Sequence, residues 1–243
     1  MRVLILSRFN TVHRNVGDAR DTRRMNDRRF SREWMKKRID LMTRYTAQSL
    51  KDQHDKRFEW YVFVQEGTPD AALDDIEELG AKVVEVEIDD VEGAQRLVRS
   101  MKGWVATVNL DTDDAVSRNF VQMVHQHTKE REGERIAFLR GCRHREVVGA
   151  NPWTVSYKSP TNPFQVVTEN AKHAETVFGE IHGTPDRLID TPAPMWLMVL
   201  HGDNIDNRRL ERTSRDENMF QSIPQYFSVM AKHNYGRNVN RGR

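Results

Sequence analysis

Three aspartates within four residues, Asp111, Asp113 and Asp114, are the side chains in this sequence whose spacing most directly indicates chemistry. They follow the apolar run 104–110, which is typical of a buried strand. Carboxylates that crowd at a buried strand end repel one another, and a divalent cation with oxygen ligands relieves that repulsion. We therefore predict that Asp111, Asp113 and Asp114 form a metal site. The alternative is an acidic turn that stabilises the start of the next helix.

A histidine follows a second apolar run. His201 comes directly after residues 195–200, and a neutral imidazole is a common ligand of divalent metals. Because the carboxylate cluster needs further ligands to complete a coordination sphere, we predict that His201 joins the metal site. The alternative is a structural histidine in the core.

The elements that must position these groups alternate along the first half of the chain. Apolar, β-branched and aromatic runs predict strands at 2–7, 58–64, 81–88 and 104–110. Apolar residues at helical spacing predict helices at 33–53, 71–79, 92–101 and 117–131. This alternation predicts an α/β fold with a mainly parallel central sheet flanked by helices. Ligands in such sheets bind beyond the carboxyl ends of the strands, which is where the acidic cluster lies.

The second half of the chain is less regular. We predict strands at 135–139 and 147–156 and a helix at 168–178. A chain of 243 residues suits one large domain. We therefore predict a single domain over 1–243, with the acidic cluster in its first half, 1–115, and a basic tail at the end of its second half, 116–243.

Composition excludes several classes of protein. Cys142 is the single cysteine, which rules out an internal disulfide and a cysteine-based zinc site. The sequence has no run of about 18 apolar residues, so we expect no membrane span and a cytoplasmic location. Net charge is only +2, but residues 13–44 and the tail 232–243 are strongly basic. Such stretches are typical of solvated surfaces or of segments that bind an anion.

Several stretches resemble the inverting nucleotide-sugar transferases, and most closely the rhamnosyltransferase family. The most specific are Asn109-Leu110-Asp111-Thr112-Asp113-Asp114-Ala115 and the later Trp196-Leu197-Met198-Val199-Leu200-His201-Gly202-Asp203-Asn204. The resemblance extends over residues 1–210. It implies an A-type glycosyltransferase fold, a nucleoside-diphosphate sugar donor and a divalent cation, Mn²⁺ or Mg²⁺, held by a DxD motif. It also implies inverting transfer of the sugar to an acceptor hydroxyl.

The resemblance and the predicted strand ends together give a set of donor-binding residues. Arg8 and Asn10 leave the first strand at its carboxyl end, and the guanidinium of Arg8 is suited to a phosphate. Gln65 stands where the wider family usually has an acidic residue, so recognition of the base differs there. The expected donor-binding set is Arg8, Asn10, Arg38, Gln65, Arg99, Asp111, Thr112 and Asp113.

An inverting transferase needs a general base for the acceptor hydroxyl. Glu169 is our first candidate, because it opens the predicted helix 168–178 in the half where the wider family places its base. Asp190 and Asp186 are rivals. The alternative for Glu169 is a carboxylate that caps the helix.

Three functional interpretations stay open. The first is transfer to a saccharide or another small hydroxyl acceptor. The second is transfer to hydroxylated bases in DNA, motivated by the basic segments 13–44 and 232–243. The third is a metal-dependent nucleotide-binding or nuclease-like module, since clustered carboxylates also hold metals for phosphodiester cleavage.

Overall fold

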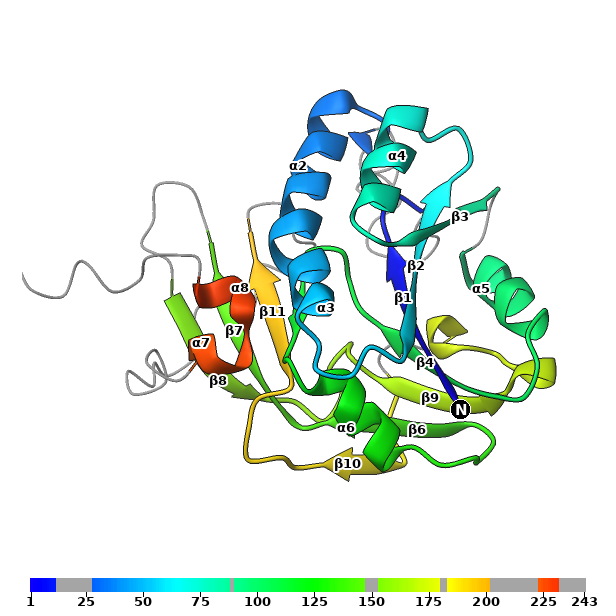
Figure 1. Ribbon diagram of the computed structural model, residues 1–243, viewed down its shortest axis with the longest axis vertical. Coiled ribbons are helices and arrows are strands. Elements are labelled where there is room, and N and C mark those ends of the chain that lie inside the picture. Colours follow the sequence, from blue (N-terminus) through cyan, green and yellow to red (C-terminus); the bar gives the residue numbers. More distant parts are fainter. Residues whose placement is uncertain (12–27, 88–89, 147–152, 180–182, 202–222, 232–243) are drawn as a thin grey trace, which may run out of the picture.

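The computed structural model describes residues 1–11, 28–87, 90–146, 153–179, 183–201 and 223–231. Its centre is a seven-stranded sheet in the order β10-β6-β9-β4-β1-β2-β3 (Figure 1). The strands of this sheet are β1 (Arg2–Arg8), β2 (Phe58–Gln65), β3 (Lys82–Val86), β4 (Trp104–Asn109), β6 (Glu134–Phe138), β9 (Val166–Asn170) and β10 (Arg187–Ile189). Only β9 runs against its neighbours, β4 and β6; the other pairs are parallel. The predicted α/β fold with a mainly parallel sheet is confirmed.

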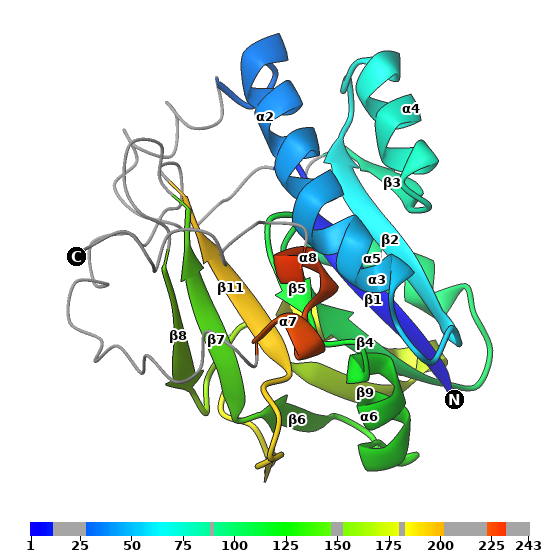
Figure 2. The ribbon, with the colours of Figure 1, turned by 60° about the vertical axis from the view of Figure 1, so that its left-hand side comes forward.

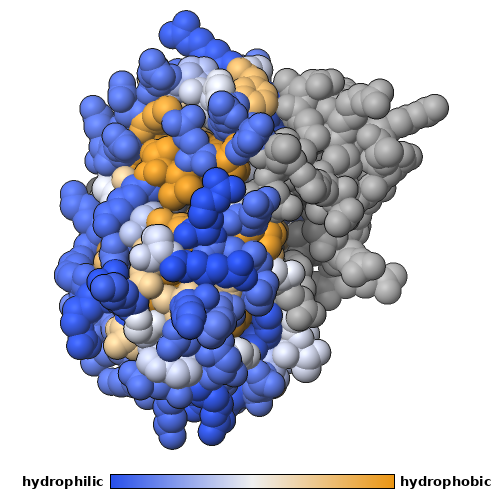
Figure 3. Space-filling view, turned by 90° about the vertical axis from the view of Figure 1, so that its right-hand side faces the viewer, coloured by the Kyte–Doolittle hydropathy of each residue, from blue (hydrophilic) through white to orange (hydrophobic). Residues whose placement is uncertain are grey.

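Helices cover both faces of this sheet because alternate side chains of each strand point to opposite sides. Val3 and Ile5 of β1 pack in one core cluster with α2 (Arg32–Met42), α3 (Gln48–Lys51), α4 (Asp70–Glu78) and α6 (Phe120–His127). Leu4 and Leu6 pack on the other face with α5 (Asp90–Arg99) and the short 3-10 helices Ala171–His173 and Val177–Gly179. Charged and polar side chains cover most of the outer face around β3 and α5, beside a limited apolar area (Figure 3).

A second sheet lies beside the first and is built from the later part of the chain (Figure 2). It has the order β5-β11-β7-β8. Its strands are β5 (Ala115–Val116), β7 (Arg140–Arg145), β8 (Trp153–Lys158) and β11 (Trp196–Leu200). Its inner face shares a core cluster with the helical segment that contains Leu41 and Tyr45, and with Phe227 and Val229 near α7 (Ile223–Tyr226) and α8 (Ser228–Ala231). β5 follows the acidic cluster directly, so that cluster lies where the two sheets meet.

The predicted helix 33–53 forms as one continuous segment with an irregular centre. The Ser31 side chain caps its start by accepting a hydrogen bond from the Trp34 amide at 3.3 Å. Between α2 and α3 the residues Thr43–Ala47 form a π-helical turn. Single π-helical turns inside α-helices are frequent at functional sites.

Predictions for the first half are confirmed in element type and order, whereas the second half needs corrections. The predicted helix 168–178 is wrong. Val166, Val167 and Thr168 are β-branched and form strand β9 between β4 and β6. The predicted helix 117–131 is shorter, over Phe120–His127. Of the predicted strand 147–156, residues 153–156 belong to β8 and the rest lie outside the described residues. In the described part of the chain, no helix combines the length and apolar character needed to cross a membrane.

Close packing fixes the junction between β7 and β11. Gly141 of β7 is paired with Trp196 of β11, and a Cβ atom added to Gly141 would lie 2.0 Å from the indole Cδ2. That indole is fully buried, stacks on Phe164 with 5.2 Å between ring centroids, and donates from Nε1 to the Phe138 carbonyl at 2.8 Å. The site therefore has no room for a side chain at position 141.

We expect the substitution Gly141→Ala to destabilise the protein, because Trp196 must leave its stacked position. Overpacking of this kind costs about 1–3 kcal/mol of unfolding free energy. Gly179→Ala is the matched control, since a Cβ there meets nothing within 4 Å. Thermal or urea unfolding of both variants measures the difference. Equal stability of the two variants would show that the sheet junction is not tightly packed.

Candidate metal centre

The acidic cluster occupies the turn that follows β4. Thr112, Asp113 and Asp114 are buried and Asp111 is half-buried. Asp111, Asp113 and Asp114 each offer a carboxylate oxygen, and these oxygens all lie within 4.8 Å of one another. The three side chains therefore converge as the sequence predicts, at the carboxyl end of a central strand.

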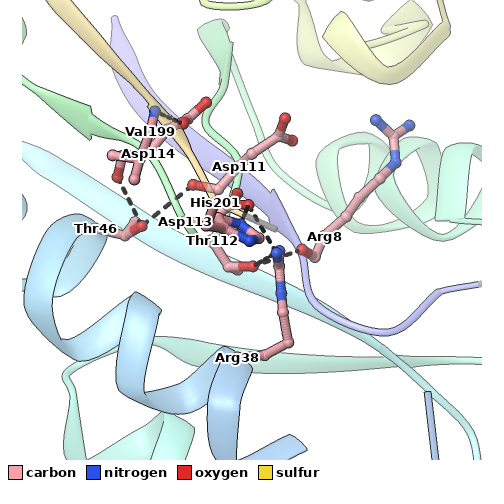
Figure 4. Close-up of polar contacts among 9 residues, drawn as sticks. All are labelled: Arg8, Arg38, Thr46, Asp111, Thr112, Asp113, Asp114, Val199 and His201. Atoms are coloured by element: carbon pink, nitrogen blue, oxygen red, sulfur yellow. Dashed lines mark hydrogen bonds and ion pairs between the residues drawn. The ribbon is translucent and has the colours of Figure 1, made fainter. Parts of the chain in front are cut away.

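Arg38, from α2, and His201, which follows β11, both contact Asp113 (Figure 4). Arg38 of α2 donates from Nη1 to Asp113 Oδ2 and from Nη2 to Thr112 Oγ1, each at 2.7 Å. His201 Nε2 lies 2.7 Å from the same Asp113 oxygen. Burial raises the pKa of the Asp113 carboxyl, but Arg38 and His201 outweigh burial and hold that pKa below its ordinary value. Asp113 is thus kept ionised.

For Asp114, the effects that raise the pKa outweigh those that lower it. Burial, together with the charges of Asp113 and Asp111, raises the pKa of Asp114 well above its ordinary value. The Val199 amide of β11 donates to Asp114 Oδ1 at 2.7 Å, which favours the ionised form but does not compensate for the crowding. Burial and the neighbouring carboxylates thus disfavour a second full negative charge beside Asp113.

Thr46 fixes the backbone of the turn. Its hydroxyl donates to the Asp114 carbonyl at 2.8 Å and to the Asp111 carbonyl at 3.2 Å. Thr46 lies in the π-helical turn, which brings the long helix against the acidic cluster. The position of the cluster thus depends on β4, on the helix and on β11 together.

These carboxylates fit a hard divalent cation. Three carboxylate oxygens within 4.8 Å are the ligand type that Mg²⁺ and Mn²⁺ prefer. Burial and the charges of Asp113 and Asp111 raise the pKa of Asp114, and a bound cation would offset both effects. His201 is outside this group of three and contacts Asp113 instead. Its imidazole is placed to orient the Asp113 carboxylate, a contact that outer residues of metal sites commonly make with a ligand.

The residues expected to bind the donor at the end of β1 are held by protein contacts. Arg8 forms an ion pair with Asp90 at 2.5 Å and lies over the Phe178 ring, 3.7 Å from its centroid. Its guanidinium points away from the cluster, while its carbonyl accepts from Thr112 Oγ1 at 3.2 Å (Figure 4). Both side chain and backbone of Arg8 therefore help to shape the edge of the sheet beside the cluster.

Asn10 and Gln65 join the ends of β1 and β2. Asn10 Oδ1 accepts from the Gln65 amide, and Asn10 Nδ2 donates to Thr68 Oγ1, both at 2.9 Å. The Gln65 side-chain amide donates to the Val86 carbonyl at 3.0 Å and also to the Glu87 carbonyl. Its Oε1 is buried and has no hydrogen-bond partner among the described residues. An acceptor of this kind at the end of β2 is available to a donor group of a ligand.

Arg99 does not belong with these residues. It lies in the last turn of α5 and donates to the Ala174 carbonyl at 3.0 Å and to Glu175 at 2.8 Å. Asp90 lies in the first turn of the same helix and forms the ion pair with Arg8. Arg99 therefore lies near the amino ends of the parallel strands, whereas the acidic cluster lies at their carboxyl ends. The prediction that Arg99 binds the donor is corrected.

Glu169 is also placed away from the cluster. It lies in β9 opposite Val105 near the start of β4, and Asp111 is six residues further along, or about 20 Å at the rise of a strand. Its carboxylate accepts hydrogen bonds from the Glu175 and Thr176 amides at 2.8 and 2.9 Å. Thr176 has a positive φ of 64°. Glu169 therefore supports a strained turn, and its assignment as general base is corrected.

Asp190 lies at the same end of the strands as the acidic cluster, just beyond the carboxyl end of β10. The pairings of β4, β9, β6 and β10 place it level with Asp111, three strand spacings away, or roughly 14 Å along the sheet. Arg140 binds its carboxylate, with Nη2 at 3.1 Å, and lowers the pKa of Asp190. Asp186, the further rival, lies just before β10 and accepts from the Arg135 amide at 2.8 Å; the same pairings place it level with Thr107, in the middle of β4 and away from the cluster.

Two contributions to the site escaped sequence analysis. Thr46 falls within the predicted helix 33–53 and Asp90 lies just before the predicted helix 92–101, and the sequence pattern singles out neither. A hydroxyl within an otherwise apolar helix face was the available signal for Thr46, whereas no local signal distinguishes Asp90. Residues 13–27 of the basic segment 13–44 and the whole basic tail 232–243 lie outside the described residues.

We expect Glu169→Ala to destabilise the protein without affecting the metal centre. Two buried backbone amides lose their acceptor, which corresponds to a loss of roughly 2 kcal/mol or more in the free energy of unfolding. Glu175→Ala is the control, because that side chain is exposed. Unfolding in the presence and absence of Mn²⁺ measures both effects. A loss of the Mn²⁺-induced stabilisation in Glu169→Ala would contradict a purely structural role.

Comparison with solved structures finds distant similarities. The chain is 10% identical to Staphylococcus aureus TarS (residues 1–349), with a TM-score of 0.42, covering 82% of this chain and 60% of that one. The same protein in complex with UDP gives a TM-score of 0.41 at 10% identity, covering 82% of this chain and 61% of that one. A protein described as a nucleotide-diphospho-sugar transferase from Desulfovibrio desulfuricans G20 is 11% identical, with a TM-score of 0.32, covering 95% of this chain and 98% of that one. This chain thus spans about 60% of the length of TarS residues 1–349.

No curated protein matches the sequence. A match to one protein family extends over residues 2–212, which is most of the chain and includes both β4 with its acidic cluster and β11 with His201. The chain belongs to the family described as "Putative rhamnosyl transferase".

Proposed function

We propose that this protein is a metal-dependent glycosyltransferase that moves a sugar from a nucleoside-diphosphate donor to an acceptor hydroxyl. The observation that carries the proposal is the convergence of Asp111, Asp113 and Asp114 within 4.8 Å at the carboxyl end of β4, in a member of a sugar-transferase family. Ligands of α/β sheets bind at such strand ends. A convergent acidic cluster at that place supports a site for a cation and the diphosphate it binds.

The carboxylates of Asp111, Asp113 and Asp114 would hold the cation. When bound, a divalent ion supplies positive charge that stabilises a departing diphosphate. Arg38 and His201 keep Asp113 ionised and in one orientation through their contacts at 2.7 Å. Arg38 also lies beside the cluster with a charge of its own, so we assign it to the donor side of the site.

The nucleotide would lie across the ends of β1 and β2. Asn10 holds these two strand ends together, and the buried Oε1 of Gln65 offers an acceptor for an N–H group of a base. Arg8 contributes through its carbonyl, which positions Thr112. This arrangement supports a donor whose base lies over β2 and whose diphosphate reaches the end of β4.

The acceptor would approach from the half of the chain after residue 115. An inverting reaction needs a base on the face of the sugar opposite the leaving group. Of our two main candidates only Asp190 is level with the acidic cluster, with about 14 Å of sheet between them for donor sugar and acceptor. We retain Asp190 as the proposed base. Its pairing with Arg140 must open in the complex, because the lowered pKa makes it a weak proton acceptor.

The test is release of nucleoside diphosphate from a panel of UDP-, dTDP- and GDP-sugars, with Mn²⁺ or with a chelator. We expect one donor class to be hydrolysed or transferred with Mn²⁺ only. Asp111→Asn should reduce that rate by about 100-fold or more, which equals the loss of roughly 3 kcal/mol of transition-state stabilisation. Asp75→Asn is the control, because that carboxylate is exposed on α4.

Two results would contradict the proposal. Full activity of the wild-type protein in chelator would exclude metal dependence. Metal-dependent cleavage of a nucleic acid strand without any release from nucleotide sugars would favour the nuclease-like interpretation instead.

A further inference from the structure

Arg29 is a buried arginine that lies just before α2 and has unused hydrogen-bond donors. Its side chain belongs to a residue that is only 4% exposed. Nη1 donates to the Asn10 carbonyl at 3.3 Å. Nε and Nη2 have no hydrogen-bond partner among the described residues. Buried guanidinium groups ordinarily satisfy their donors, so two unpartnered donor atoms on one side chain need an explanation.

Within the part of the chain that the structure describes, Arg29 forms no ion pair of its own. Burial lowers the pKa of Arg29 to about 10, and Asp90 is the acid that opposes this effect. Asp90 is already occupied: it binds Arg8 through both carboxylate oxygens and accepts from Thr11 Oγ1 at 2.8 Å. Among the described residues, the single carboxylate of Asp90 thus faces the two guanidinium groups of Arg8 and Arg29. A buried charge without a partner is costly unless an anion binds.

The geometry of the unpartnered donors indicates which chemical class of ligand fits them. Nε–H and Nη2–H form one edge of the planar guanidinium and point in parallel, which suits two oxygens of one phosphate or carboxylate group. A neutral base would satisfy the hydrogen bonds but not the positive charge. The combination of a vacant two-donor edge and an uncompensated charge therefore favours an oxyanion.

The position of Arg29 connects it with the candidate metal centre. Its partner Asn10 lies two residues beyond the end of β1, and the carbonyl of Arg8 at that strand end accepts from Thr112 of the acidic cluster at 3.2 Å. An oxyanion bound to Arg29 would thus lie at the same carboxyl ends of the strands as the proposed cation site.

We propose that Arg29 binds a phosphate group of the donor through its Nε/Nη2 edge, and that it is the arginine of this strand end that recognises the diphosphate, in place of Arg8. The inference rests on the proposed function, because it takes the donor to be a nucleoside diphosphate. Arg8 neutralises Asp90 and thereby leaves the charge of Arg29 available to the ligand.

The experiment is calorimetric titration of the full chain in chelator, so that the metal centre does not contribute. The probes are inorganic pyrophosphate, inorganic phosphate, and whichever of UDP, dTDP and GDP binds the wild-type protein most tightly, together with its nucleoside. Arg29→Gln is compared with Arg28→Gln, which removes the same charge from an exposed neighbour. Thermal unfolding of the ligand-free variants accompanies each titration.

We expect Arg29→Gln to weaken binding of the nucleoside diphosphate and of pyrophosphate by about tenfold or more, the usual effect of losing charge-assisted hydrogen bonds. Binding of the nucleoside should change by less than about twofold, and Arg28→Gln should behave as wild type. The ligand-free Arg29→Gln protein should unfold within about 3 °C of wild type, because Gln removes an uncompensated buried charge. If that variant does not fold, Arg29→Lys carries the comparison, since it keeps a charge but lacks the two-donor edge.

Equal affinity of wild type and Arg29→Gln for the nucleoside diphosphate would overturn the inference. Loss of phosphate or pyrophosphate binding with unchanged nucleoside-diphosphate binding would overturn it as well, because the site would then take free phosphate rather than the donor. Failure of the wild-type protein to bind any of the three nucleoside diphosphates, in chelator or with Mn²⁺, would instead contradict the proposed function.

Discussion

Electrostatic repulsion among three carboxylates at the end of β4 is the constraint on which the rest of this structure depends. Their oxygens lie within 4.8 Å of one another in a largely buried turn. Asp113 is ionised between Arg38 and His201, while burial and the charges of Asp113 and Asp111 raise the pKa of Asp114 despite the Val199 amide. Crowded carboxylates of this kind are costly to bury and suit a cation site.

The contacts that hold the cluster also hold the two sheets together. β4 ends at Asp111 and β5 begins after Asp114, so the turn itself connects the sheets. Asp114 and Asp113 reach β11 and the residue that follows it, and Thr46 ties the same turn to the long helix. The first sheet with its helices provides the strand ends over which we place the nucleotide. The second sheet supplies His201 and the wall on the acceptor side. A change in the cluster is therefore expected to alter both binding and the relation between the sheets.

Sequence patterns predicted the part of the site that lies within short segments. The cluster 111–114 and His201 were found because each follows an apolar run, and the structure brings them into contact. Glu169 and Arg99 were misplaced because their segments were identified without the register that assigns each residue to one edge of the sheet. Thr46 was missed because a π-helical turn has the same apolar pattern as a regular helix. The positions of these residues depend on contacts between distant segments of the chain, and no local sequence pattern contains that information. The antiparallel strand β9 is the clearest example, since its β-branched residues only become a strand between two partners.

The central claim is that the acidic cluster holds a divalent cation at the end of β4. Anomalous diffraction from crystals grown with Mn²⁺ and a nucleoside diphosphate tests it most directly. Our account predicts one manganese peak at about 2.0–2.3 Å from carboxylate oxygens of the Asp111, Asp113 and Asp114 group, with a phosphate oxygen as a further ligand. A nucleotide bound at the ends of β1 and β2 with no manganese at the cluster, and with Asp113 still held only by Arg38 and His201, would contradict it.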